Sequence, residues 1–177
     1  MTLVLEDGSG VAGADTYATL DEFKAYWDLH GETTAVKEAD DCKMEIALRI
    51  ATQYLELSCG PVFIGFKRTK AQGLHFPVNS GVRNDGFTLD TTEIPQEVKD
   101  AEFELAERSL AGTNLFDPDQ VGGVGSIQST TKKVGPIEKK TEFTEAGQDI
   151  ETNFPKVNQI LGQIIHDFSG FSPVIRS

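Results

Sequence analysis

Apolar side chains recur at helical spacing in four stretches of the chain, and the stretch 43–57 has the widest apolar surface. At about 100° per residue, two neighbouring apolar stripes run along this stretch. The first stripe contains Met44, Ala47, Leu48, Ala51, Tyr54 and Leu55, and the second contains Ile46, Ile50 and Leu57. Together they span an arc of roughly 200°, which is far wider than a surface helix needs. The segment is therefore expected to be the hub of a helical core or one wall of a subunit interface.

Three further helices are expected around this one. Thr19 is followed three residues later by Glu22, a capping box that predicts a helix over 19–30. Proline in the first turn opens a second helix over 95–111, and apolar spacing predicts a third over 155–168. Each of these helices offers one apolar face to a common core. The chain is therefore expected to be mainly α-helical.

The outer face of the helix over 95–111 is expected to be strongly acidic. The acidic residues assigned to this face are Glu97, Asp100, Glu102, Glu104 and Glu107. A run of charge on one helical face is usually a solvated surface. The alternative interpretation is a face that lines something to which it must not bind.

The stretch 57–84 differs from the rest of the chain because it contains no acidic residue. Its cations and aromatic residues alternate in the order Phe63, Phe66, Lys67, Arg68, Lys70, Phe76 and Arg83. Positive charge attracts a phosphate backbone and aromatic rings stack on bases, so this composition is typical of a single-strand-binding surface. The alternative is a structural loop whose phenylalanines fill the core and whose cations face the acidic helices.

A β-like alternation over 126–143, around Val134-Gly135-Pro136, predicts an extended hairpin. Four lysines flank its turn, namely Lys132, Lys133, Lys139 and Lys140. Lysines on exposed strand edges prevent pairing with other chains, so they protect the hairpin in one interpretation. In the other interpretation the hairpin is an arm that docks on an acidic neighbour. The apolar tail of the chain is a second candidate for docking, through Phe171 and Ile175.

Charge and composition narrow the function classes. The chain has 28 acidic and 16 basic side chains, a net charge of −12, whereas most nucleic-acid-binding domains are basic. Residues 1–125 hold 22 of the acidic and 10 of the basic side chains, so residues 126–177 are neutral. We expect no signal peptide, because the first residues lack a basic start and a long apolar run. No apolar run approaches the ~20 residues that a membrane span requires.

No cofactor, metal or catalytic group is predicted. Residues 8–13 fit the GxGxxG pattern of dinucleotide-binding turns, but no helix starts on these glycines and no second βαβ unit follows. Cys42 and Cys59 lack CxxC spacing and are expected to be reduced thiols. Asp117 and Asp119 lack the register of a calcium loop. Since no nucleophile–base pair stands out either, we expect a protein that is not an enzyme.

These patterns predict a mainly α fold, a small bundle of three to four helices with an extended β-hairpin arm and flexible termini. The expected layout is an N-terminal arm over 1–18, a helical core over 19–112, a linker loop over 113–125, a hairpin arm over 126–146, and a C-terminal helix and tail over 147–177.

Several short blocks resemble a known family when they are taken together. The blocks are Leu5–Gly8, Gly10–Ala14, Thr16–Tyr17, Arg49–Leu55, Gln72–Val78, Ile94–Lys99, Glu104–Ala106 and Val134–Ile137. In this order they resemble small tailed-bacteriophage proteins that are labelled DnaT-like single-stranded-DNA-binding proteins. Such proteins also look like head–tail connector, or neck adaptor, subunits of the phage virion.

The connector resemblance implies a structural adaptor made in the host cytoplasm and located in the virion neck, between capsid and tail. It implies a ring of twelve copies that binds the portal protein and a tail or second neck protein, and through which double-stranded DNA passes. In this interpretation Lys67, Arg68, the four hairpin lysines, Phe171 and Ile175 contact partners. The alternative is a DnaT-like protein that binds single-stranded DNA in replication. The connector is the function expected from the sequence.

Overall fold

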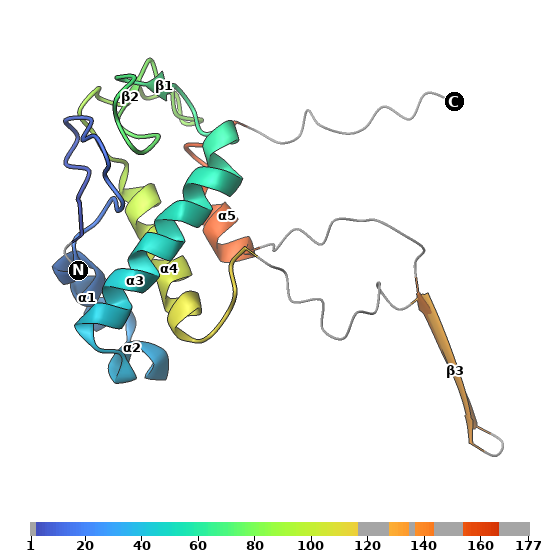
Figure 1. The fold of residues 1–177 in the computed structure, drawn as a ribbon. Coiled ribbons are helices and arrows are strands. Elements are labelled where there is room, and N and C mark those ends of the chain that lie inside the picture. Colours follow the sequence, from blue (N-terminus) through green and yellow to red (C-terminus); the bar gives the residue numbers. More distant parts are fainter. Residues whose placement is uncertain (1–2, 117–127, 135–136, 144–153, 167–177) are drawn as a thin grey trace, which may run out of the picture. The chain divides into compact units, whose positions relative to one another are not determined.

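In the computed structural model, residues 3–116, 128–134, 137–143 and 154–166 are described. The chain divides into two compact units, one of residues 1–115 and 154–177 and one of residues 116–153. The described residues form five α-helices and four strands, which confirms a mainly α chain (Figure 1). The helices are α1 Leu20–His30, α2 Thr34–Glu38, α3 Asp41–Tyr54, α4 Gln96–Leu110 and α5 Pro155–Leu161. The strands are β1 Phe66–Lys67, β2 Val78–Asn79, β3 Gln128–Val134 and β4 Ile137–Phe143.

Helix α1 begins and ends as the sequence predicts. The Thr19 hydroxyl accepts a hydrogen bond from the Glu22 amide (3.1 Å), and the Glu22 carboxylate accepts one from the Thr19 amide (2.7 Å). Gly31, with a φ of 85°, ends the helix. The buried Phe23 ring packs edge-on against Phe103 of α4, with 5.8 Å between ring centroids. The capping box therefore fixes the start of a helix whose aromatic face belongs to the core.

The central helix α3 begins two residues before the predicted apolar stretch 43–57 and ends three residues before the end of that stretch. Residues 34–38 form the separate helix α2, and extended backbone at Ala39 separates the two helices. The Asp40 side chain then caps α3 by accepting a hydrogen bond from the Lys43 amide (2.8 Å). After Tyr54 the chain continues as a π-helical turn over Leu55–Cys59 and a 3-10 turn over Gly60–Val62. Of the predicted first stripe, Met44, Ala47, Leu48, Ala51 and Leu55 are buried and Tyr54 is partly buried.

Helix α4, rather than α3, is the hub of the core. It packs against α1, α2, α3 and α5, and α3 crosses in front of it in Figure 1. Its buried residues are Val98, Ala101, Glu102, Phe103, Glu104, Leu105 and Ala106. The expectation that Glu102 and Glu104 lie on a solvated outer face is wrong. Residues 16–17 cover Glu102, and side chains of α1 and α5 cover Glu104.

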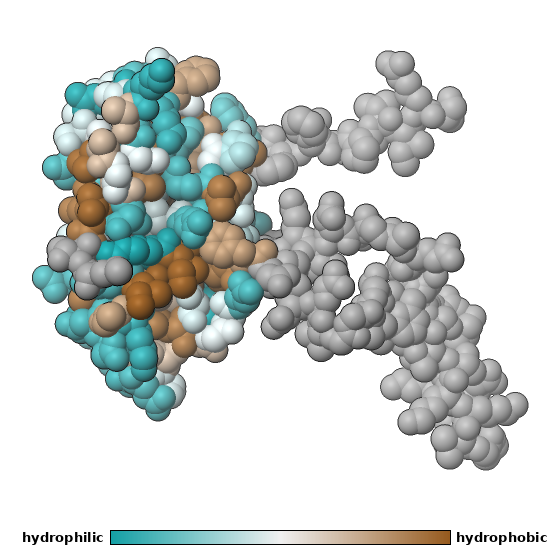
Figure 2. All heavy atoms as spheres, in the orientation of Figure 1, coloured by the Kyte–Doolittle hydropathy of each residue, from teal (hydrophilic) through white to brown (hydrophobic). Residues whose placement is uncertain are grey.

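The second apolar stripe of α3 is only partly covered. Ile50 packs against the core, whereas Ile46 is 48% exposed and Leu57 is 63% exposed. Helix α5 reaches α3 at Tyr54, whose ring meets that of Phe154 at 5.5 Å. On the face shown in Figure 2, apolar patches lie among mainly hydrophilic residues.

The helix expected over 155–168 ends at Leu161. The chain then turns, and the Ile64 amide donates to the Ile164 carbonyl (3.0 Å) while the His166 amide donates to the Val62 carbonyl (2.8 Å). Phe63 and Ile165 form an antiparallel bridge within this pairing. Residues 164–166 therefore pair with residues 62–64 through backbone hydrogen bonds instead of continuing the helix.

Residues 3–18, expected as a flexible arm, pack on the helices. Leu5 and Thr16 form a parallel bridge, and Tyr17 and Ala18 are fully buried. Asp15 accepts a hydrogen bond from Arg49 Nε of α3 (2.7 Å).

Within the described residues, none of the helices combines the length and apolar character that a membrane span requires.

The predicted hairpin is present in the second unit. Strands β3 and β4 pair antiparallel, with Lys132 opposite Lys139 and Val134 opposite Ile137 at the turn. Strands β1 and β2 of the first unit form a separate antiparallel pair, with Phe66 opposite Asn79.

Candidate nucleic-acid interface

The acid-free stretch of the sequence folds into a loop held closed by β1 and β2, and we call residues 65–79 the basic–aromatic loop. Gly65 enters the loop with a φ of 78°. A Cβ at this position would come within 2.9 Å of the Val78 side chain, so the position requires glycine. Because Gly65 turns the chain and packs against Val78, the next residue, Phe66, begins β1 at the edge of the first unit.

The side chain of Gln72 holds the loop from inside. Its Nε2 donates hydrogen bonds towards the carbonyls of Leu74 (2.9 Å), His75 (2.9 Å) and Pro77 (3.0 Å). Its Oε1 accepts one from the Thr69 amide (2.8 Å). The side chain is buried, so these bonds replace solvation that the amide has lost. A single side chain therefore satisfies the backbone of both halves of the loop.

The outer surface of the loop carries one ring and three cations. Phe66 is 78% exposed, and Lys67, Arg68 and Lys70 are exposed next to it. Lys67 Nζ donates to the Gly73 carbonyl (3.2 Å), and Arg68 Nη1 donates to the Gly8 carbonyl (3.0 Å). No carboxylate of the described residues forms an ion pair with these three cations. The charges of Lys67 and Lys70 are therefore available to an anionic ligand, together with part of the charge of Arg68, which also acts on the Asp90 carboxylate.

The other residues of the acid-free stretch have structural roles. Phe63 and Phe76 are buried and meet edge-on, with 5.1 Å between ring centroids. The Arg83 guanidinium forms ion pairs with Glu97 and Asp85, and these hydrogen bonds raise its pKa. His75 is half-buried against the Phe63 and Phe76 rings, and burial lowers its pKa. The interpretation as a structural loop therefore holds for these residues, whereas Phe66 and the three cations lie on the surface.

The remaining predicted contact residues belong to the hairpin and to the apolar tail. Lys132 and Lys139 occupy opposite register positions of β3 and β4, where Thr131 also faces Lys140 and Lys133 faces Glu138. Phe171 and Ile175 lie outside the described residues.

The glycine-rich turn at 8–13 is filled by the chain itself. The Glu6 carboxylate accepts hydrogen bonds from the amides of Gly8 (3.0 Å), Gly10 (2.9 Å) and Val11 (2.8 Å). Glu6 is buried, so it occupies the position that a phosphate would need. Because its amides already have an anionic partner, this turn does not offer a dinucleotide site.

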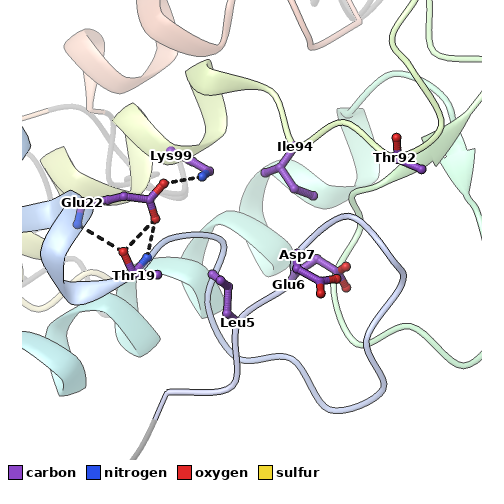
Figure 3. Close-up of a pocket in the computed structure, with 8 residues that line it drawn as sticks. All are labelled: Leu5, Glu6, Asp7, Thr19, Glu22, Thr92, Ile94 and Lys99. Carbon is purple, nitrogen blue, oxygen red and sulfur yellow. Dashed lines mark hydrogen bonds and ion pairs between the residues drawn. The ribbon is translucent and has the colours of Figure 1, made fainter.

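A shallow hollow lies between this turn and the start of α1. Its lining includes Leu5, Asp7, Thr92 and Ile94, and Figure 3 shows Thr19, Glu22 and Lys99 hydrogen-bonded to one another beside them. Lys99 Nζ lies 2.6 Å from Glu22 Oε1, so the cation at this hollow is already paired. Within the described residues, no group of three or more histidine, cysteine or acidic side chains could hold a metal ion.

Two carboxyl groups on α4 are buried, and their burial was not predicted from the sequence. Glu102 is fully buried against Thr16, Thr52 and the Tyr17 amide, and burial raises its pKa to about 8. Glu104 is 3% exposed and accepts hydrogen bonds from Tyr26 (2.9 Å) and Lys156 (2.6 Å). Glu102 is four residues after Val98 and three before Leu105, so helical spacing alone places it beside the apolar face.

Comparison with known families identifies the chain. One family model, described as "Putative DnaT-like ssDNA binding protein", matches residues 1–177. No curated protein and no solved structure matches the chain.

The expected head–tail connector is contradicted by this match. The matching model covers the whole chain and is not that of a neck adaptor family, so the interpretation as a portal-binding ring that passes double-stranded DNA is wrong. The resemblance was correct in its other part, the DnaT-like label. The chain belongs to the family of DnaT-like single-stranded-DNA-binding proteins.

Proposed function

We propose that this chain binds single-stranded DNA through the basic–aromatic loop. The observation that carries the proposal is the exposed Phe66 ring beside three cations that form no close ion pair with a carboxylate of the described residues. A single exposed phenylalanine is common on a protein surface, so the argument depends on the position of this ring beside the three cations. The description of the matching family supports the same function.

The two kinds of side chain have separate tasks in this proposal. Lys67, Arg68 and Lys70 attract the phosphate backbone, and a base of the bound strand stacks on Phe66. The bases of a duplex already stack on each other, so the ring favours a single strand. The net charge of −12 repels DNA from the rest of the surface and confines binding to the loop.

The salt dependence of binding tests the role of the cations. Each cation that neutralises a phosphate of a single strand contributes about 0.7 to the slope of log K against log salt concentration. With three cations the slope is about −2, and Lys67→Ala with Lys70→Ala reduces its magnitude to about 0.7. Fluorescence anisotropy of a labelled dT20 oligonucleotide between about 50 and 200 mM salt measures these slopes.

The matched control removes two exposed lysines elsewhere, Lys37 of α2 and Lys43 of α3. Lys37→Ala with Lys43→Ala changes the net charge equally and is expected to leave the slope unchanged. Equal slopes for the two double variants would show that the loop is not the contact surface. Failure of the wild-type chain to bind dT20 at any of these salt concentrations would refute the function itself.

Two expectations remain predictions. The proposed function is binding rather than catalysis, and the observations on the loop do not test whether the chain is an enzyme. The expectation that the protein is located in the virion also stays a prediction.

A further inference from the structure

The buried Tyr17 and the half-buried Glu56 form a hydrogen-bonded pair that contacts the basic–aromatic loop. Glu56 Oε1 accepts a hydrogen bond from the Tyr17 hydroxyl and another from the His75 amide (3.0 Å). The Tyr17 oxygen in turn accepts one from the Phe76 amide (3.2 Å). Two consecutive backbone amides of the loop are therefore held by one tyrosine and one glutamate.

The pair connects the loop to distant parts of the chain. Glu56 lies in the π-helical turn Leu55–Cys59 that follows α3, and Tyr17 lies in the N-terminal segment. Tyr17 is fully buried, and its pKa is raised by burial and by the neighbouring Glu56, so its hydroxyl keeps the proton that it donates. The turn is a local departure from α-helical geometry, of a kind often found at functional sites.

The position of these contacts within the loop matters for the proposed binding surface. His75 and Phe76 immediately precede the segment that pairs with β1, where Val78 is opposite Lys67 and Asn79 is opposite Phe66. The hydrogen bonds to the two amides thus hold β2 in place, and β2 pairs with Phe66 and Lys67 of β1. We propose that Tyr17 and Glu56 are positioning residues for single-stranded DNA binding, an inference that rests on the proposed function.

If Glu56 acted through its charge instead, its replacement would change the affinity for DNA in the opposite direction. Its carboxylate contacts the His75 amide of the loop, so its negative charge could instead repel the phosphate backbone. Glu56→Gln removes the charge but keeps an oxygen that accepts both hydrogen bonds, whereas Glu56→Ala removes both. Positioning predicts that Glu56→Gln retains affinity and Glu56→Ala loses it. Repulsion predicts that both variants bind more tightly.

The affinity for dT20 separates these outcomes. Loss of these hydrogen bonds is expected to weaken binding about three- to tenfold in Glu56→Ala and in Tyr17→Phe, while Glu56→Gln stays within about twofold of the wild type. Gln53→Ala changes an exposed residue of α3 one turn earlier and serves as the control. Measurements are made well below the unfolding temperature of each variant, so that only folded protein is compared. Equal affinity of Glu56→Ala, Tyr17→Phe and the wild type would overturn the inference.

Amide hydrogen exchange provides a readout that does not depend on DNA. Positioning predicts faster exchange at the His75 amide in Glu56→Ala and at the Phe76 amide in Tyr17→Phe, with little change elsewhere in the first unit. Unchanged exchange at these amides would refute the positioning role whether or not DNA binds. If exchange changes as expected but the wild-type chain does not bind dT20, the proposed function fails and the positioning of the loop stands.

Discussion

The buried carboxyl group of Glu102 makes a sharp prediction about how stability depends on pH. Thr16 Oγ1 lies 2.6 Å from Glu102 Oε1 and 2.8 Å from the Ala18 carbonyl oxygen, and Thr52 Oγ1 lies 2.8 Å from Glu102 Oε1 and 3.0 Å from the Leu48 carbonyl oxygen. Each hydroxyl has one hydrogen, so two hydrogens serve these four contacts. Protonation of Glu102 adds a third.

Glu102→Gln supplies the missing hydrogens. The two hydrogens of the amide nitrogen point to Thr16 Oγ1 and Thr52 Oγ1, which are then free to donate to Ala18 and Leu48. The amide oxygen takes the place of Glu102 Oε2 and accepts a hydrogen bond from the Tyr17 amide, whose nitrogen lies 3.2 Å from Oε2 in the wild type. All the contacts of the site are satisfied without a charge, so the variant is expected to be at least as stable as the wild type near neutral pH.

The sign of the pH dependence follows from the raised pKa. Burial raises the pKa of Glu102 from 4.5 to about 8, so between these pH values the native state holds a proton that the unfolded state has released. The free energy of unfolding of the wild type therefore falls as pH rises through this window, by up to about 1.4 kcal/mol per pH unit. From pH 5.5 to 7.5 the wild type is expected to lose roughly 2–3 kcal/mol relative to Glu102→Gln.

Urea unfolding followed by the fluorescence of Trp27 measures this difference at several pH values. Other titrating groups affect both proteins alike and cancel in the comparison. Glu107→Gln, at a half-buried position of the same helix, is the control for the change in net charge. A difference between the wild type and Glu102→Gln that does not vary from pH 5.5 to 7.5 would refute the reasoning, because it would mean that the buried group does not titrate in this range.

Two further predictions concern local structure. Gly8→Ala is expected to cost more than about 2 kcal/mol of unfolding free energy, because the new Cβ would lie 2.0 Å from the Thr92 carbonyl oxygen at a φ of 92°. Gly13→Ala meets no atom within 4 Å and should cost only the backbone strain, so equal losses for the two variants in urea unfolding would contradict this account. Thr19→Ala removes the cap of α1 and should cost about 1 kcal/mol, and no loss on thermal unfolding would show that the capping box is dispensable.

Local signals in the sequence predicted local structure well. The capping box at Thr19 and Glu22, the glycine that ends α1 and the apolar face of α3 are all present in the structure. These signals act within a few residues, so the sequence contains all the partners that they need. The hairpin of β3 and β4 was predicted for the same reason, since only two residues separate its strands in the sequence.

Contacts between distant segments were not predictable in the same way. Helical spacing places Glu102 beside the apolar face of α4, but its burial depends on residues 16–17, which the sequence of the helix does not indicate. The partner of the glycine-rich turn was not predicted, because Glu6 precedes the motif and only the fold brings its carboxylate inside. In both cases the deciding partner comes from a segment whose position depends on tertiary packing.

The position of the candidate site in the sequence could be predicted, but the roles of its individual residues could not. The acid-free stretch was identified from composition, yet Phe63, Phe66 and Phe76 are chemically identical and their roles could not be distinguished. Only the fold shows that two of these rings are buried and that Phe66 is exposed. In the same way, Arg83 looked like part of the basic surface until its pairing with Glu97 was visible.

The affinity of Phe66→Ala for single-stranded DNA tests the central claim most directly. Phe87 offers a matched control, because it is 72% exposed in the same unit but lies next to Asp85 rather than beside unpaired cations. Stacking of one base on an aromatic ring contributes about 1–3 kcal/mol, so Phe66→Ala is expected to weaken binding of dT20 between about fivefold and a hundredfold. Phe87→Ala is expected to bind as the wild type does, and duplex DNA should bind weakly to all three proteins. Wild-type affinity of Phe66→Ala for dT20 would contradict the account.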